Sequence, residues 1–502
     1  MLRKNLGRQD AETEVFLDKI IEKEGGCNDN VLLIILSEIN DDEEKAQRLV
    51  TYSLLHRSAN PSAIGEEGVT PLHLAVKNNF KSVCTKLLDH GAKVDAENKN
   101  MPYTLALENR NDDIAAMLIR KMKKETVRNL YSRVKKNENP KFSFHDLLEK
   151  EEMSETVLAV LDCMKEPIGE GEKVRVYYNV LEADREGHVP SDGENIDSES
   201  KTGFQFIAQK GDKTIVNHDV VRLLIMRKWE KYARSRFLFK ALLNLITLVT
   251  ITFSAIVAST AQDPTLYNNS ALQIARAVFE MWSLGMTFYK LLHEIQQLRK
   301  LRLQYFKYAS NWVDTTSCLL ILLLPPLRFT HKNEQWFVFS AAYLFWTARM
   351  FQYATVFRKS GAYVLILRRI IKHDILQFTI FFAFILLAFS GCLLLSLRGE
   401  GSLEKFSESS TYWSILFVGI RILIEAKRIL EYTEFQTISV IIMVGFLFTI
   451  CIVLLNILIA QVSDTFQDVQ QDAQREYEVT RASIVTRMEQ NSLCFCKVIF
   501  SL

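Results

Sequence analysis

Glu425 is the residue whose surroundings most clearly indicate a chemical role. It follows the short apolar run Tyr412 to Ile420, and the basic residues Lys427 and Arg428 come directly after it. This run is too short to cross a bilayer, because a spanning helix needs about 20 apolar residues. We therefore expect the segment to enter the membrane and return. Acidic side chains at such positions concentrate cations at the mouth of a pore.

Two long apolar segments flank this short run. Neither Ile375 to Leu397 nor Phe435 to Ser463 contains a charged residue, and each is long enough to span a bilayer. Irregular backbone at membrane depth is tolerated only where protein buries it or where it lines water. The pattern of helix, short helix, acid and helix over residues 375–463 therefore predicts a pore. A plain helical hairpin in lipid is the alternative.

The composition separates a soluble module from a membrane module. The mean hydropathy of +0.03 averages a charged region, residues 1–236, with long apolar runs in residues 237–463. The net charge is only +2, and the basic residues cluster beside the apolar runs, so we expect no nucleic-acid partner. The segment Met1 to Asp10 is charged and lacks the apolar core of a signal peptide. We expect the N-terminus to be cytoplasmic.

Four further apolar segments precede the predicted pore. The loop after the first of them lacks a basic residue until Arg276, whereas the loops after the second and fourth are strongly basic. Basic loops stay on the cytoplasmic side, so the chain is predicted to span the membrane six times with both termini inside. The four segments are Phe237 to Ala258, Ile274 to Leu292, Trp312 to Leu327 and Trp336 to Tyr353.

Charged residues inside these segments predict structural pairs. The fourth segment contains Arg349 alone, unlike the arginine ladder of a voltage sensor, so strong voltage gating is not expected. Glu280 and Asp314 lie in the second and third segments. We interpret them as partners for a buried cation such as Arg349, and a ligand-binding role is the alternative.

The soluble module contains an ankyrin-like repeat. Gly68-Val-Thr-Pro-Leu-His-Leu-Ala75, followed by Gly91, resembles the ankyrin pattern of a tight turn, two helices and a terminal glycine. Pro102, Leu105 and Ala106 repeat the first copy 31 residues later. Residues 1–140 are therefore assigned to ankyrin repeats, with clear copies at 65–122. The stretches Val31 to Ile39 and Lys45 to Leu55 are candidates for another repeat.

Residues 141–236 are interpreted as a cytosolic linker. Ser154 to Met164 is predicted to be a short helix, and the runs Val174 to Val180 and Phe204 to Ala208 are predicted to form a small sheet. An acidic loop, Asp184 to Lys201, separates the two runs. Its carboxylates lack calcium-loop spacing, so a solvated loop is favoured over a cation site. On either side of the linker we expect a repeat helix over Asn111 to Val134 and a basic amphipathic helix over His218 to Lys240, along the inner membrane face.

Cysteines and one sequon are further candidate sites. The eight cysteines lack metal spacing, so neither a metal nor a cofactor is expected. Cys163 and Cys84 lie near lysines, which lower a thiol pKa, and are candidate reactive thiols. For Cys84, burial within a repeat is the favoured alternative. Asn268, in Asn268-Asn269-Ser270, is a candidate glycosylation acceptor on the outer side.

The end of the last apolar segment carries a family resemblance. Leu455-Asn-Ile-Leu-Ile-Ala-Gln-Val-Ser-Asp-Thr-Phe466, continued by Gln470-Gln-Asp-Ala-Gln-Arg475, resembles the ankyrin branch of transient receptor potential channels, in particular insect painless-like members. The resemblance covers nearly the whole chain. It implies a mostly α protein that forms a tetramer around a pore permeable to cations, including Na⁺ and Ca²⁺. The implied stimuli are noxious heat, irritants or mechanical force, as in thermosensation and nociception.

The resemblance also assigns the membrane regions and the predicted filter. Residues 237–374 become a four-helix sensor-like bundle, 375–463 the pore domain and 464–502 a cytosolic C-terminal helix and tail. Glu425 aligns with the filter acid and Ile424 precedes it, where family members commonly have glycine. This departure leaves calcium preference and conduction as a homotetramer open.

The predicted gate follows from helical spacing in the last segment. Asn456, Ile459 and Ser463 share one helix face, and Ile459 would form a dry apolar constriction if that face lines the pore.

The motifs of the sequence also bear on functions other than a channel. A palmitoyltransferase with ankyrin repeats would need Asp-His-His-Cys, and none of the nine histidines adjoins another, so no enzyme is predicted. A non-conducting or modulatory subunit, or an ankyrin membrane scaffold, stays open because of the unusual filter. The expected location is the plasma membrane, as a homotetramer or a heterotetramer with related subunits.

Overall fold

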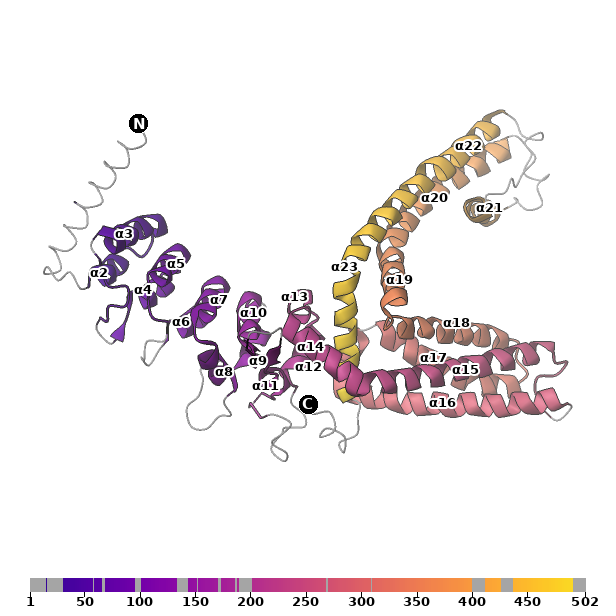
Figure 1. Cartoon of the computed structure of the whole chain (residues 1–502). Coiled ribbons are helices and arrows are strands. Elements are labelled where there is room, and N and C mark those ends of the chain that lie inside the picture. Colours follow the sequence, from indigo (N-terminus) through magenta and orange to yellow (C-terminus); the bar gives the residue numbers. More distant parts are fainter. Residues whose placement is uncertain are drawn as a thin grey trace. The chain divides into compact units, whose positions relative to one another are not determined.

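The computed structural model is mostly helical and consists of two compact units. One contains the chain up to Arg236 together with the residues from Arg481 onward, and the other is Phe237–Thr480 (Figure 1). The structure describes Val15 and residues 30–56, 58–65, 68–94, 101–132, 143–150, 152–169, 173–185, 187–188, 201–267, 270–307, 309–399, 411–425 and 437–490.

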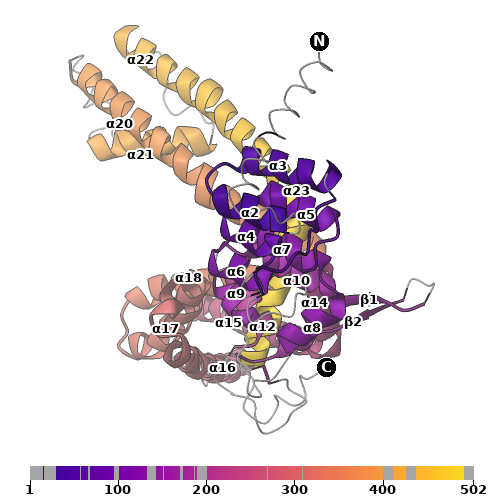
Figure 2. The same ribbon diagram turned by 90° about the vertical axis from the view of Figure 1, so that its left-hand side faces the viewer.

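Three helix pairs open the first unit. Apolar side chains at helical spacing bury each pair against the next, with Leu72, Val83 and Leu107 fully buried. Pro71 begins one helix and Gly91, with φ of 88°, follows another, as predicted. The candidate repeat over residues 31–55 also forms a pair of helices. The helices are α2 (Val31–Glu38), α3 (Glu43–His56), α4 (Pro71–Lys77), α5 (Lys81–Asp89), α6 (Pro102–Glu108) and α7 (Asp112–Lys121), stacked in order in Figure 2.

The single helix predicted over Asn111 to Val134 is wrong. Helix α7 ends at Lys121, because Met122 takes an extended conformation with ψ of 156°. A separate helix, α8 (Lys124–Ser132), follows. Apolar spacing continues through both helices, so the break leaves no signal in the hydrophobic pattern. Arg133 and the residues after it lie outside the described ranges.

The linker contains short helices and one two-stranded sheet. Strand β1 (Lys165–Pro167) pairs antiparallel with β2 (Val174–Val176), which confirms a small β element. The prediction for Phe204 to Ala208 is wrong. These residues lie in α12 (Gly203–Lys210), which Thr202 caps at its start and Gly211, at φ of 69°, ends. The other linker helices are α9 (Phe144–Glu149), α10 (Ser154–Cys163), α11 (Asn179–Glu182) and α13 (Lys213–Val216).

The segment before the first span is helical, but protein already buries its apolar side. Helix α14 (Asp219–Lys228) continues through the π-helical turn η4 (Trp229–Ala233). Val220, Val221, Leu224 and Ile225 are fully buried in the first unit. The expectation of an apolar face lying on the membrane is therefore wrong for α14.

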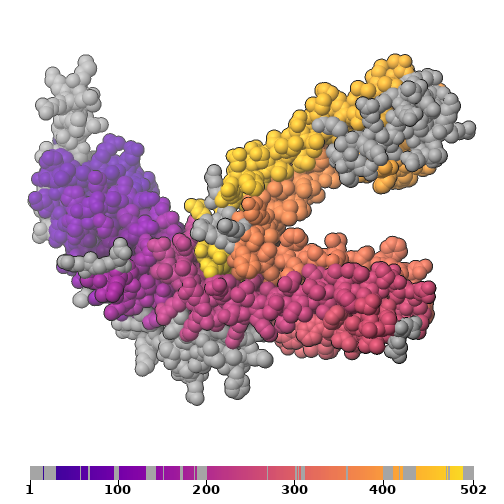
Figure 3. Space-filling model, turned by 45° about the vertical axis from the view of Figure 1, so that its right-hand side comes forward, coloured from indigo at the N-terminus to yellow at the C-terminus, as the bar shows by residue number. Residues whose placement is uncertain are grey.

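The second unit begins with four long helices. Ile251, Ile321, Phe339, Ala342 and Trp346 form their common apolar core. Figure 3 shows the outer surface of these helices in pink to salmon. These helices coincide with the four predicted segments. They are α15 (Arg234–Thr260), α16 (Ala271–Leu301), α17 (Ala309–Phe329) and α18 (Glu334–Ala354), with the 3₁₀ turn η5 (Arg302–Lys307) between α16 and α17.

The remaining helices include those of the predicted pore region, residues 375–463, together with the segments before and after it. They are α19 (Arg358–Arg369), the π-turn η6 (Ile370–Ile375), α20 (Leu376–Gly399), α21 (Tyr412–Glu425), α22 (Thr437–Phe448), the π-turn η9 (Thr449–Leu454) and α23 (Leu455–Gln490). Helix α20 packs against both α21 and α22.

Four helical stretches among the described residues are long and apolar enough to cross a membrane. They are Asp219–Thr260, Asn311–Phe329, Ser360–Gly399 and Thr437–Gln470. Helices α16 and α18 contain charged residues, which lower their average hydropathy. Six spans and a re-entrant loop therefore stay predictions.

Candidate functional site: the pore helices and the charged bundle

The helices of the predicted pore region share one apolar core. Phe378, Phe382 and Leu386 of α20 pack with Phe446, Ile450 and Leu454 of the inner helix. Leu416 and Ile420 of α21 contact the same cluster. The short helix is therefore held between the two long helices that flank it in sequence.

Gly419 allows α21 to approach closely. A Cβ atom at this position would clash with Leu386 of α20 and would lie 3.2 Å from Cζ of Phe446. A larger residue at this position would therefore force the side chains of Leu386 and Phe446 to shift.

The predicted filter residues lie at the end of α21. The helix continues beyond the predicted run Tyr412 to Ile420 and ends at Glu425, with Ile424 before it. The side chains of both residues, and the whole of Lys427 and Arg428, fall outside what the structure describes. The role of Glu425 in the filter therefore stays a prediction.

The predicted gate residues share an exposed face of α23. Asn456, Ile459 and Ser463 are all exposed, and the exposed fraction of Ile459 is 58%. Leu454 and Leu458 instead contact the cluster that includes α20. One face of the inner helix thus packs within the chain, and the face with Ile459 has no packing partner in a single described subunit.

Arg349 and Asp314 form the ion pair that the sequence predicted. Nε of Arg349 lies 2.8 Å from Oδ1 of Asp314, and both side chains are largely buried. Trp346, one turn earlier, packs under Lys290, whose Nζ is 4.0 Å from the ring centroid. Lys290 also donates a hydrogen bond to Asn244 of α15. Arg349 is thus paired with a carboxylate, whereas Lys290 contacts an aromatic ring and an amide oxygen.

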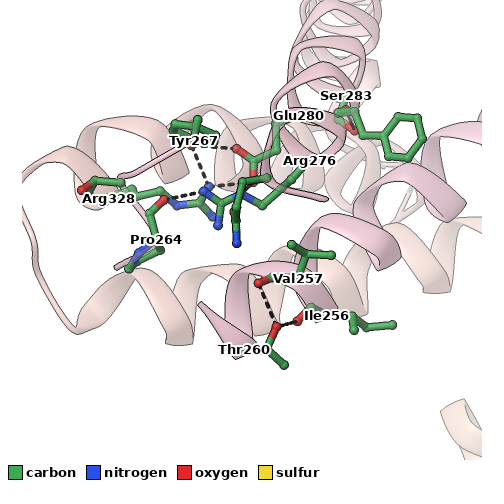
Figure 4. A network of polar contacts seen from close by, with 12 residues as sticks. Ile256, Val257, Thr260, Pro264, Tyr267, Arg276, Glu280, Ser283 and Arg328 are labelled. Atoms are coloured by element: carbon green, nitrogen blue, oxygen red, sulfur yellow. Dashed lines mark hydrogen bonds and ion pairs between the residues drawn. The ribbon is translucent and has the colours of Figure 1, made fainter. Parts of the chain in front are cut away.

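Glu280 pairs with Arg328 and Arg276, and not with Arg349. Its Oε1 accepts a hydrogen bond of 2.7 Å from Nη1 of Arg328, and its Oε2 accepts one of 2.9 Å from the Tyr267 hydroxyl (Figure 4). Arg276 is fully buried and donates to the carbonyl of Pro264 at 2.8 Å. This network joins α16, α17 and the loop between α15 and α16.

Both candidate thiols are buried. Cys84 is fully buried, and burial raises its pKa to about 12, which confirms the favoured alternative for this residue. Cys163 is only 4% exposed, and burial raises its pKa despite the opposing effect of Lys124. A reactive Cys163 is therefore not supported, because desolvation outweighs the basic neighbours. Asn268 lies outside the described residues.

A buried ion cluster in the first unit was missed at the sequence level. Lys228 of α14 lies between Glu182 of α11 and Glu489 of α23, at 3.2 Å and 2.8 Å. These residues are far apart in the sequence and have no motif spacing, so only tertiary structure reveals them. Among the described residues, no group of three or more His, Cys, Asp or Glu side chains forms a metal site.

Ankyrin-type helix pairs joined to long apolar helices define the class as an ankyrin-repeat membrane protein. Residues 33–129 match the family model for ankyrin repeats in three copies. Residues 247–495 match the model described as "Calcium channel YVC1-like, C-terminal". Residues 247–495 are thus similar to a calcium-channel family, and residues 33–129 are similar to ankyrin repeats.

Two curated relatives are cation channels. The chain is 22% identical over 325 residues to transient receptor potential cation channel subfamily V member 1 of Cavia porcellus, an alignment covering 59% of this chain. It is 21% identical over 327 residues to the same protein of Canis lupus familiaris. The alignments span 38% and 39% of these relatives' own lengths. The relatives are ion channels, not enzymes, and their subfamily is V, so the painless-like assignment stays a prediction.

Proposed function

We propose that this chain is a subunit of a tetrameric, non-selective cation channel that conducts Na⁺ and Ca²⁺ across the plasma membrane. The observation that carries the proposal is the calcium-channel family match, which covers all of α20, α21 and α22. The mutual packing of these three helices supports a pore domain. Heat, irritants or mechanical force are the proposed stimuli.

The proposed filter is a ring of Glu425 side chains. In a four-fold assembly each chain supplies one carboxylate, and such rings attract cations and hold divalent ions. Crowded carboxylates also raise one another's pKa, so part of the ring is protonated unless cations screen it. Lys427 and Arg428 follow Glu425 in the sequence and would weaken the attraction if they reach the ring.

Reversal potentials under exchanged calcium and sodium test this proposal. Glu425→Gln should lower the permeability of Ca²⁺ relative to Na⁺ and weaken block by external polyvalent cations. Surface expression and stimulus threshold should be nearly unchanged. Glu334→Gln is the matched control, because Glu334 is an exposed carboxylate at the start of α18.

An unchanged permeability ratio in Glu425→Gln would place Glu425 away from the ion path. Absence of current from the purified wild-type chain in bilayers, across a heat ramp, would instead favour the modulatory-subunit alternative. The first result would contradict only the assignment of Glu425 to the filter, whereas the second would contradict the proposed channel function.

A further inference from the structure

The buried ion cluster in the first unit contains two carboxylates and one ammonium group. Lys228, Glu182 and Glu489 are each under 10% exposed. Nζ of Lys228 donates a 2.8 Å hydrogen bond to Oε1 of Glu489 and lies 3.2 Å from Oε1 of Glu182. These three formal charges sum to −1, so the two carboxylates compete for one cation.

Glu489 is the better-satisfied carboxylate of the two. Its Oε1 also accepts a 2.5 Å hydrogen bond from the Tyr232 hydroxyl, and its Oε2 accepts one of 3.2 Å from Nε2 of Gln205. Oε1 of Glu182 is buried and accepts no hydrogen bond in favourable geometry. Removal of Glu489 would leave Lys228 with the poorer partner.

A second contact holds the same part of α23. The guanidinium of Arg481 lies 4.9 Å from the ring centroid of Trp229, in the turn directly after Lys228. Arg481 and Glu489 are eight residues apart, so two successive stretches of the helix are anchored on α14 and η4. Cation–π contacts of this kind add modestly to a buried ion pair.

The groups facing Glu182 give the cluster a response to pH. Burial raises the pKa of Glu182, and the charge of Glu489 raises it further, while Lys228 and Arg227 lower it. Lys228 keeps its proton, because the two carboxylates outweigh the effect of burial and raise its pKa. Tyr178, Tyr232 and Arg236 are the other titratable or charged groups around the cluster.

We propose that Lys228 is a latch for the C-terminal end of α23, and that competition between Glu182 and Glu489 for Lys228 sets how firmly the latch holds. The inference rests on the proposed function in one respect. Helix α23 also carries Ile459, so the latch would regulate the gate through one continuous helix.

The direction of the pH effect follows from Glu182. A carboxyl whose pKa is raised in the folded state binds its proton more tightly there, so folding is favoured by acid and weakened as pH rises. Protonated Glu182 releases Lys228 wholly to Glu489. Cytosolic acidification should therefore tighten the latch, and alkalinisation should loosen it.

Hydrogen-exchange mass spectrometry on the full chain in lipid nanodiscs tests the latch without requiring conduction. Glu489→Gln should raise exchange in peptides covering residues 481–490 about tenfold or more, because it leaves a buried ammonium poorly paired. Glu182→Gln mimics the protonated carboxyl, so it should lower exchange there and remove the dependence of protection on pH. Glu155→Gln is the control, since it removes only an exposed ion pair with Arg120.

Peptides of helices α4 and α5 report whether each variant is folded and should keep their protection. If Glu182→Gln and Glu489→Gln both loosen residues 481–490, the two carboxylates do not compete and the proposal is wrong. Unchanged exchange in both variants would equally overturn it. If exchange changes as expected but open probability does not, the latch stands and its regulation of the gate fails.

Discussion

At the scale of residues, two buried ion pairs join neighbouring helices of the bundle. Arg349 and Asp314 pair across α18 and α17, and Glu280 pairs with Arg328 across α16 and α17. Ionisable groups are costly at membrane depth unless they are paired. These pairs therefore specify how the helices of the bundle meet.

Removing one partner of the Arg349–Asp314 pair should destabilise the bundle. Arg349→Gln removes the buried ion pair with Asp314, with an expected cost of about 3–5 kcal/mol. The double variant with Asp314→Asn should recover much of this loss, because no uncompensated charge remains. Thermal unfolding of the purified chain in nanodiscs measures both. Equal destabilisation by the single and double variants would show that the two residues do not interact.

The two buried thiols should react in a defined order. Mild alkylation followed by mass spectrometry should label Cys163 before Cys84, because Cys84 is fully buried and its pKa is about 12. Raising the pH from neutral should increase labelling of both, since a raised pKa leaves little thiolate at neutral pH. Denatured protein, in which both thiols are accessible, is the control. Earlier labelling of Cys84 would contradict this prediction.

At the scale of elements, α21 depends on close approach to its neighbours. Gly419→Ala should displace α21 from Leu386 and Phe446, at a cost of about 1–3 kcal/mol for overpacking. Gly391→Ala is the matched control, because a Cβ atom at Gly391 of α20 meets no atom within 4 Å. Thermal unfolding and single-channel conductance measure the effect. Leu386→Ala itself removes core packing, so the test is a double-mutant cycle: Gly419→Ala should cost less in the Leu386→Ala background than in the wild type, and an equal cost would place the strain elsewhere.

At the scale of the whole molecule, the proposed gate requires several copies of the chain. Ile459 is 58% exposed in one chain, so an apolar ring exists only if copies assemble around this face. Ile459→Ser should wet the constriction and raise resting current. The control is Ile457→Ser, a neighbouring exposed isoleucine about 200° away around the helix. Unchanged resting current at normal surface expression would remove Ile459 from the gate.

The sequence by itself determined the two modules and most of the helices. Apolar length identified the helices of residues 237–463, and Thr-Pro-Leu-His with Gly91 identified the repeats, because these signals depend on local spacing and backbone conformation. It also predicted the Asp314–Arg349 pair, since a charge within an apolar helix requires a partner. Local patterns did not reveal the break at Met122, and β-prone residues at Phe204–Ala208 were overridden by the caps of α12.

Only the tertiary structure decided which distant residues meet. The lysines near Cys163 suggested a reactive thiol, but the packing around it raises its pKa instead. The packing role of Gly419 follows only from the side chains of Leu386 and Phe446, which lie next to it in the folded chain. Lys228 could not be matched to Glu489, 261 residues away, because no periodicity links them. Burial and long-range pairing depend on the folded path of the whole chain, and these properties decide the chemistry of each site.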